Sequence, residues 1–310
     1  GIYRGHAWYM TGFSSASPVT SAALHVDSGS DIVSVYLNNT YIGTVLPTGK
    51  AVDLTLPGSL VIKGENSLVF RVQIWGHSIY HVPKISGTFD IPTIVLDSKR
   101  GLFGKAWVKL GANTVNLTEW KALSKLEGER DGFPSADYDT SGWQAIAQPI
   151  TSGTPLVLED GQTLWYRAQF SSSSLPNPAR IFAPVLIKLI GKNCMATIWF
   201  NNHLIGRWLS DSDWLLKGVD TDVKGTAKKA VRNMWIEQEP DSLDKFYLPL
   251  SYTEEGQNTV TIAFEDASNS DYQVPPDQGI VNSVEIVYNT DYLDGSTGAL
   301  LRSAITITPP

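Results

Sequence analysis

Cysteine and charge are scarce in this sequence. Cys194 is the one cysteine among 310 residues, so no disulfide can form within the chain, and we expect its thiol to be a small buried apolar group. Charged residues make up 18% of the chain, and 24 Lys and Arg against 31 Asp and Glu give a formal net charge of −7. Nucleic-acid binding depends on clustered Lys and Arg, so we expect no nucleic-acid partner.

Long apolar runs and several catalytic motifs are also missing. Nothing approaches the run of about 18 apolar residues that indicates a transmembrane helix, so we expect no membrane span. The chain contains no Gly-x-Ser-x-Gly elbow, no P-loop and no Gly-x-Gly-x-x-Gly fingerprint. Hydrolase, NTPase and dinucleotide-binding interpretations therefore have no motif behind them.

What the sequence does contain is an internal repeat. The segment Tyr36–Gly43 matches Trp199–Gly206, 163 positions further on, and Tyr3-Arg4 matches Tyr166-Arg167 at the same offset. Internal repeats indicate the architecture before any other signal does. Because a match this early places the first residues inside a strand, we expect a processed chain or a piece of a larger protein.

The offset between the two copies then changes. Leu56-Pro57 matches Leu248-Pro249, and 64–68 matches 256–260, both 192 positions apart. The step from 163 to 192 predicts an insertion of 29 residues in the second copy. Each copy is too long for a solenoid repeat, so the chain holds two homologous domains.

Both copies have the pattern of β-strands. Apolar residues alternate with other residues over 68–75 and over 260–265, which is typical of strands with one buried face. Asn38-Asn39 and Asn201-Asn202 supply hairpin turns whose residues tolerate positive φ. The sequence therefore predicts an all-β chain of two tandem jelly-roll β-sandwich domains.

Domain boundaries follow from the repeat. Two segments are predicted to be helical, 116–126 and 224–235. We place the first sandwich at 1–111, an inter-domain join at 112–150, the second sandwich at 151–290 with a partly helical insertion at about 209–243, and a C-terminal tail at 291–310.

Several motifs occur together in a recognisable order. Tyr3–His6, the hairpin Val35–Gly43, Gly64–Leu68 and Arg100–Gly104 together resemble the C-terminal jelly-roll domains of glycoside hydrolase family 35 β-galactosidases. Asp137–Trp143 also resembles a recurrent opening motif of sugar-binding jelly rolls. The resemblance runs through most of the chain.

This resemblance implies an accessory role rather than catalysis. The catalytic carboxylates of that family lie on a (β/α)₈ barrel, which needs about 250 residues of alternating β and α segments that are not present here. We therefore expect no enzyme activity. The implied partners are a galactoside-type carbohydrate or glycan surface, a catalytic barrel domain, or other copies of the chain. Two N-glycosylation sequons, at Asn38 and Asn116, permit secretion, and an extracellular, cell-surface or virion-surface location is expected.

Carboxylate pairs are the first candidates for chemistry, since glycosidases use two. Glu127 with Glu129, and Glu237 with Glu239, are the close pairs in sequence. No signal of a deep cleft flanks either pair. We interpret all four as solvated surface residues.

Metal ligands are the second class of candidate. His77 and His81 have a metal-like spacing but follow a strand in a loop, so no zinc site is expected. Acidic residues around Trp214 are weak candidates for a structural calcium, although their spacing matches no defined loop. These residues are Asp211, Asp213, Asp220 and Asp222. No other cofactor is expected.

Aromatic residues are the most informative class, with ten Trp and twelve Tyr in the chain. Sugar rings stack on aromatic faces, and planar polar groups bond their hydroxyls. The side of strand 68–75 opposite the core carries residues of these types, and more follow in the next loop. The predicted carbohydrate-binding residues are Arg71, Gln73, Trp75, His77, Tyr80, His81 and Trp214. Trp75 packing against the neighbouring domain is an equal alternative.

Two functions of different class stay open at this point. The first is a non-catalytic carbohydrate-associated module pair, binding galactosides or assisting a β-galactosidase-like enzyme. The second is a structural or host-attachment protein, viral or cell-surface, that uses tandem jelly rolls for assembly. Jelly rolls serve both purposes, so the fold alone does not choose between them.

Overall fold

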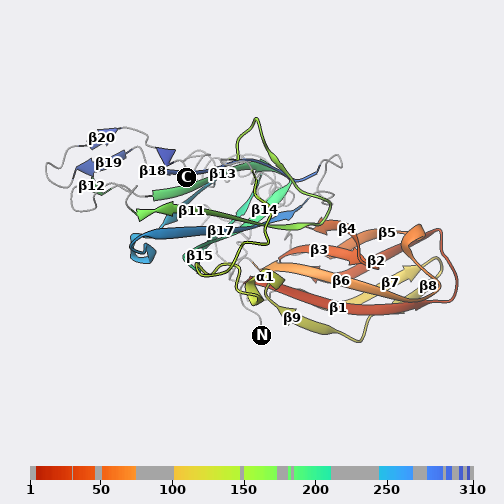
Figure 1. The fold of residues 1–310 in the computed structure, drawn as a ribbon. Helices are drawn as coiled ribbons and strands as arrows, with labels where there is room; N and C mark the ends of the chain where they lie inside the picture. The colour runs from red at the N-terminus through yellow and green to blue at the C-terminus, as the bar shows by residue number, and fades with distance from the viewer. Residues whose placement is uncertain are drawn as a thin grey trace, which may run out of the picture. The chain divides into compact units, whose positions relative to one another are not determined.

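In the computed structural model, most of the residues that are described lie in antiparallel strands (Figure 1). The residues that the structure describes are 5–29, 31–45, 51–74, 101–146, 150–172, 181–182, 185–210, 244–267, 278–288, 291–294, 300–302 and 306–307. Contacts divide the chain into two compact units, with a boundary between Leu126 and Glu127. No helix among the described residues is long and apolar enough to cross a membrane.

The first unit is a sandwich of two antiparallel sheets, ordered β4-β3-β6-β1-β9 and β5-β2-β7-β8. The chain passes back and forth between the sheets, as in a jelly roll. Its strands are β1 (Gly5–Ser15), β2 (Ser21–Gly29), β3 (Ile32–Leu37), β4 (Thr40–Val45), β5 (Val52–Pro57), β6 (Gly64–Ile74), β7 (Leu102–Leu110), β8 (Asn113–Asn116) and β9 (Lys121–Ser124), with a 3₁₀ turn η1 (Gly58–Leu60).

Alternation along the strands builds the core of this unit. In β5, Val52, Leu54 and Leu56 are buried while the residues between them are exposed. The cluster they join includes Val35 of β3 and Phe70 of β6, so both sheets contribute to one core. Burying one such side chain fully contributes about 1.5–3 kcal/mol.

The second unit has the same plan. Its main sheets are β11-β17-β14-β15 and β10-β18-β13-β16, with β21 pairing β18 and a small sheet β12-β19-β20. Its elements are α1 (Glu127–Arg130), β10 (Leu156–Val157), β11 (Thr163–Ser171), β12 (Ile181–Phe182), β13 (Val185–Lys192), β14 (Cys194–Phe200), β15 (His203–Leu209), β16 (Lys245–Leu248), η4 (Leu250–Tyr252), β17 (Gln257–Asp266), β18 (Ile280–Tyr288), β19 (Asp291–Asp294), β20 (Leu300–Arg302) and β21 (Thr306–Ile307). Cys194 is fully buried in its core.

Strand order confirms the duplicated plan. The order β4-β3-β6-β1 in the first unit corresponds to β15-β14-β17-β11 in the second, and β5-β2-β7 corresponds to β16-β13-β18. Asn38 and Asn39 have φ of 48° and 66°, and Asn201 and Asn202 have φ of 45° and 67°. The prediction of two tandem jelly-roll sandwiches is confirmed.

One sequence match was wrong. Leu68 of β6 pairs with Thr11 of β1, and the corresponding Val260 of β17 pairs with Ala168 of β11. This register aligns Tyr166 with Tyr9 rather than with Tyr3. Tyr3 and Arg4 themselves lie outside the described residues. The repeat that the register supports is a Trp-Tyr pair with a Phe four positions after the Tyr. It occurs at Trp8 to Phe13 and again at Trp165 to Phe170.

The helix predicted at 116–126 is also wrong. Asn116 ends strand β8, and Lys121–Ser124 forms β9 along the edge of β1. A segment this short is a marginal helix, whereas pairing with an open strand edge satisfies its backbone groups. The segment predicted at 224–235, and the insertion after residue 210, lie outside the described residues.

The residues taken as a join divide between the two units. Strands β8 and β9 pair with β7 and β1 in the first unit. Residues from Glu127 onward belong to the second unit, where Ile150 enters the core. Residues placed in the C-terminal tail also form strands, since β21 pairs with β18 of the second unit.

Candidate functional site

The predicted platform on β6 is not open to solvent. Arg71 and Gln73 do lie on the side of the strand opposite the core, but they are only 2% and 1% exposed. The guanidinium carbon of Arg71 lies 6.0 Å from the ring centroid of Trp8 and 5.8 Å from that of Tyr36. The prediction of a surface platform at Arg71 and Gln73 is therefore corrected, because neighbouring strands place side chains over them.

Polar contacts hold both side chains in place. Arg71 Nη2 donates to Ser34 Oγ at 3.3 Å, and Gln73 Nε2 lies 3.4 Å from Nε2 of His6. Alternation along one strand identified the correct face but could not show what the adjacent strands contribute to it.

The remaining predicted site residues lie outside the described residues: Trp75, His77, Tyr80, His81, Trp214, Asp211, Asp213, Asp220 and Asp222. Within the described part of the chain, no three His, Cys, Asp or Glu side chains are grouped so that they could hold a metal ion. Glu127 is exposed and Glu129 half-buried, and Glu237 and Glu239 lie outside the described residues.

The other sheet of the first unit carries an open row of polar and aromatic residues. His25 of β2 pairs with Asp53 of β5 on one side and with Trp107 of β7 on the other, and Trp107 pairs with Asn116 of β8. These four residues, called here the β2 row, cross all four strands on the face opposite the core. Their neighbours along each strand, such as Leu24 and Val26, point into the core.

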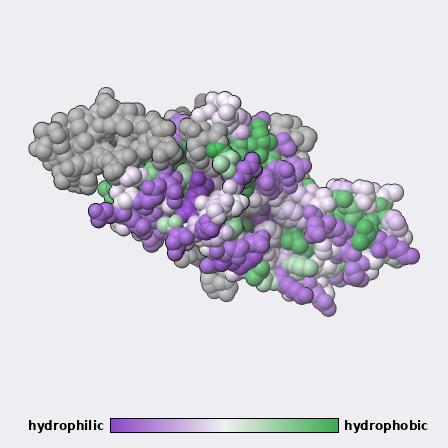
Figure 2. All heavy atoms as spheres, in the orientation of Figure 1, coloured by the Kyte–Doolittle hydropathy of each residue, from purple (hydrophilic) through white to green (hydrophobic). Residues whose placement is uncertain are grey.

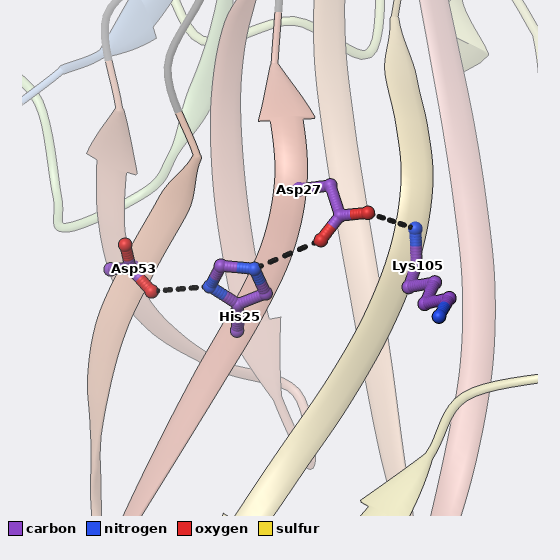
Figure 3. Close-up of polar contacts among 4 residues, drawn as sticks. All are labelled: His25, Asp27, Asp53 and Lys105. Carbon is purple, nitrogen blue, oxygen red and sulfur yellow. Dashed lines mark hydrogen bonds and ion pairs between the residues drawn. The ribbon is translucent and has the colours of Figure 1, made fainter.

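Hydrogen bonds from both ring nitrogens hold His25 in this row (Figure 3). Nδ1 lies 2.6 Å from Asp53 Oδ1, and Nε2 lies 3.1 Å from Asp27 Oδ1. The backbone N–H of Lys105 donates to the other oxygen of Asp27 at 2.8 Å. A ring that donates from both nitrogens is an imidazolium, so this arrangement favours the charged form of His25.

The pKa values follow from these contacts. The pKa of His25 is raised from its ordinary value, first by the hydrogen bond to Asp53 and then by Asp27, while partial burial opposes the shift. The pKa of Asp27 is lowered, first by the backbone N–H of Lys105 and then by His25. The His25 side chain is 20% exposed, that of Asp27 47% and that of Asp53 70%, so water and small solutes can reach the carboxylates.

Trp107 gives the β2 row an aromatic surface. Its ring stacks on His25 with centroids 4.7 Å apart and planes at 17°. Ala23 lies two residues before His25 on β2, on the same face of the sheet, and its side chain is small. An aromatic ring with carboxylate and amide groups in line can contact a sugar ring and accept and donate to its hydroxyls.

The second unit shows that the fold does not require these residues. Leu248 corresponds to Leu56 of the first unit. Leu248 pairs with Val185 as Leu56 pairs with Ala22, so Val185 corresponds to Ala22. The positions of Asp53, His25 and Trp107 are then occupied by Lys245, Lys188 and Glu285. The same sandwich therefore forms with two lysines and a glutamate in place of the β2 row.

The β2 row is not predictable from the sequence, for a physical reason. Alternation does show that His25 and Trp107 point away from the core, because apolar residues flank each of them. Their meeting depends on which distant strands pair and in which register. That long-range information is not carried by either segment alone.

A second aromatic group lies on the other unit. Phe133 contacts Tyr138, Trp143 and Trp165 with ring centroids 4.8, 5.2 and 5.2 Å away. Arg167 ties the same loop to β11 by donating to the carbonyls of Ala136, at 2.6 Å, and Tyr138, at 3.2 Å. The loop predicted as an opening motif of sugar-binding jelly rolls is thus packed on its own sheet, and its rings are half-buried.

Exposed surface is mostly polar, with apolar patches, as Figure 2 shows on the visible face. Large exposed apolar residues of the first unit include Met10 (47%), Ile62 (52%) and Leu123 (52%). Leu123 pairs with Trp8, and Met10 lies two positions from Trp8 on the same face of β1, so Leu123 and Met10 form one small apolar patch with Trp8, and small apolar patches are normal on protein surfaces. The β2 row, with its charge pairs and stacked ring, is the more specific feature.

No family model and no curated protein matches the chain. Similar solved structures include a lectin from Pleurotus ostreatus, with 12% identity and a TM-score of 0.28 over 100% of this chain and 76% of the lectin. A glycoside hydrolase family 78 rhamnosidase from Bacillus sp. GL1 gives 12% identity and a TM-score of 0.31, over 95% of this chain and 33% of the enzyme. A β-galactosidase-like protein from Bacteroides fragilis gives 11% identity and a TM-score of 0.24, over 99% of this chain and 33% of that protein. Likeness at this level carries no argument about function.

Proposed function

We propose that the chain is a non-catalytic, carbohydrate-associated pair of jelly-roll sandwiches, and that the β2 row is its saccharide-binding surface. The observation that carries the proposal is the alignment of Asp53, His25, Trp107 and Asn116 across an open sheet face. The sandwich forms in the second unit without these residue types, so stability alone does not account for them.

The chemistry of the β2 row suits a neutral saccharide. The exposed part of the Trp107 ring offers an apolar surface for the C–H face of a sugar. Asp53 and Asn116 lie at the two ends of the row and supply acceptors and donors for hydroxyl groups. Galactosides are the first ligands to test, because of the resemblance to family 35 accessory domains. An extracellular or surface location belongs to the same proposal.

Binding to a glycan array tests this proposal, followed by calorimetry with the best galactoside. Trp107→Ala should weaken binding by about tenfold or more, the usual cost of removing a central aromatic contact. Trp120→Ala is the matched control, since Trp120 belongs to the same unit but lies outside the β2 row. A triple exchange to the residues of the second unit, His25→Lys with Asp53→Lys and Trp107→Glu, should abolish binding and leave the fold intact.

Two results would end the proposal. If the wild-type chain binds no saccharide on the array, the β2 row is not a sugar site. A large assembly by light scattering would then favour a structural or attachment protein. If the chain alone hydrolyses a chromogenic galactoside, it is an enzyme and not an accessory module.

A further inference from the structure

We propose that Asn116 is an N-glycosylation site and that Asn38, the other sequon asparagine, is not. The inference rests on the extracellular location proposed above. Asn116 is also the last residue of the β2 row, so a glycan on its Nδ2 would take the amide that the row offers to a free saccharide, and the two proposals are tested on different forms of the chain. The two sequons look equivalent in sequence, and the structure separates them.

Asn116 is open to a modifying enzyme. It is the last residue of the edge strand β8, and its side chain and that of Thr118 are exposed. Leu117 between them is buried, and its N–H donates to the carbonyl of Ala106 at 2.9 Å. The sequon is therefore anchored at its middle residue while its asparagine and threonine face solvent.

The side-chain amide of Asn38 is fully used in hydrogen bonds within the first unit. Its Nδ2 donates to the carbonyl of Leu60 at 2.8 Å and to Asn66 Oδ1 at 2.9 Å, which uses both amide hydrogens. Its Oδ1 accepts from the N–H of Ser67 at 2.9 Å. A glycan on Nδ2 removes one of those hydrogens and puts a bulky group where η1 packs.

The second unit shows why an asparagine stands at position 38. Asn201 makes the same contacts, donating to the carbonyl of Tyr252 at 2.7 Å and to Asn258 Oδ1 at 2.8 Å. His203 follows it two positions later, so Asn201 is in no sequon. An asparagine at this hairpin position is thus explained by its hydrogen bonds, without any glycosylation. Among the described residues, the Asn116 side chain has no comparable set of hydrogen bonds.

The modification step is a simple transfer. Asn116 Nδ2 forms a bond to C1 of the first sugar of a lipid-diphosphate-linked oligosaccharide. The bond from C1 to the diphosphate oxygen breaks, the lipid diphosphate leaves, and Nδ2 loses one proton. The new sugar begins at the end of the β2 row beside Trp107, so saccharide binding is measured on the unglycosylated chain.

Expression of the chain behind a secretion leader in a eukaryotic host tests the proposal. Intact mass before and after enzymatic deglycosylation should show one N-glycan, and glycopeptide mapping should place it on Asn116. Thr118→Ala should remove it. Thr40→Ala, the matched change in the other sequon, should leave the glycan mass unchanged.

The outcomes are distinct from those of the saccharide experiment. Folded chain with no glycan on Asn116, or with a glycan on Asn38, overturns the inference. If little protein is secreted, the membrane fraction of the same cells is analysed, since the transfer occurs before secretion. A bare Asn116 there also overturns it.

Discussion

In the first unit Arg71 of the central strand β6 lies between Trp8 and Tyr36, whereas in the second unit Ala263 takes its position. Trp165 and Trp199, which align with Trp8 and Tyr36, stack directly on each other with centroids 5.3 Å apart and planes at 26°. The rings Trp8 and Tyr36 are 6.4 Å apart. The corresponding sheet faces of the two units are therefore packed in two ways. In the first unit a cation lies between two rings, and in the second two rings stack over a small residue.

The asparagine hydrogen bonds that hold each Asn-Asn hairpin turn, called here the hairpin clamp, are by contrast the same in both units. Asn66 bonds Ile62 and Asn38, and Asn258 bonds Glu254 and Asn201 in the same pattern. Both hairpins also carry a β-bulge at the same place, after Val35 and after Ile198. Turn and clamp positions are thus shared, while the outer faces of the sheets differ.

The largest expected effect on stability comes from placing the arginine of the first unit at the corresponding position of the second. Ala263→Arg puts a charge at a position that is 0% exposed and occupied by the Trp165–Trp199 stack. We expect the second unit to lose about 3–5 kcal/mol of unfolding free energy, the usual cost of a buried charge without a partner. Calorimetric unfolding should show one transition moved to lower temperature.

The matched control is the same exchange at an exposed strand alanine. Ala122→Arg on β9 should change stability by no more than about 0.5 kcal/mol. If Ala263→Arg unfolds like the wild type, the second face has room for a cation and the contrast with Arg71 is not a packing effect.

The clamp asparagines should be costly to remove, and equally so. Asn66→Ala deletes two accepted and two donated hydrogen bonds, and Asn258→Ala deletes the corresponding set. Because backbone groups would then lack partners, we expect a loss of about 2–4 kcal/mol in each case. Urea unfolding of the two variants gives the comparison. A clear inequality would show that one hairpin depends on the clamp and the other does not.

The parts that sequence could predict are those set by local chemistry. The paired asparagines at positive φ and the alternation in β6 and β17 are visible in short segments, and so is the second copy. The burial of Arg71 was not visible, because the rings that cover it come from β1 and β3. The β2 row was missed for the same reason, since Asp53 and Trp107 reach His25 through the pairing of distant strands. Register between distant strands is the information that composition and spacing lack.

The smallest expected effect concerns the charge on His25. The pKa of His25 is raised chiefly by its hydrogen bond to Asp53, so Asp53→Asn should lower that pKa. Because folding raises the pKa, the contribution of His25 to stability is complete below its ordinary value of about 6.5 and is lost as pH rises through the folded value. The pair is partly exposed, so this contribution should not exceed about 1 kcal/mol. Titration of the His25 ring resonances by NMR measures the shift in both proteins.

Glu285→Gln, at the position of the second unit that aligns with Trp107, is the control and should leave the His25 titration unchanged. If wild-type His25 titrates at or below its ordinary value, the ring is not held as an imidazolium between Asp53 and Asp27. The Asp53 carboxylate would then be uncompensated, so the β2 row would carry a net negative charge and would differ even more in charge from the lysine-rich row of the second unit.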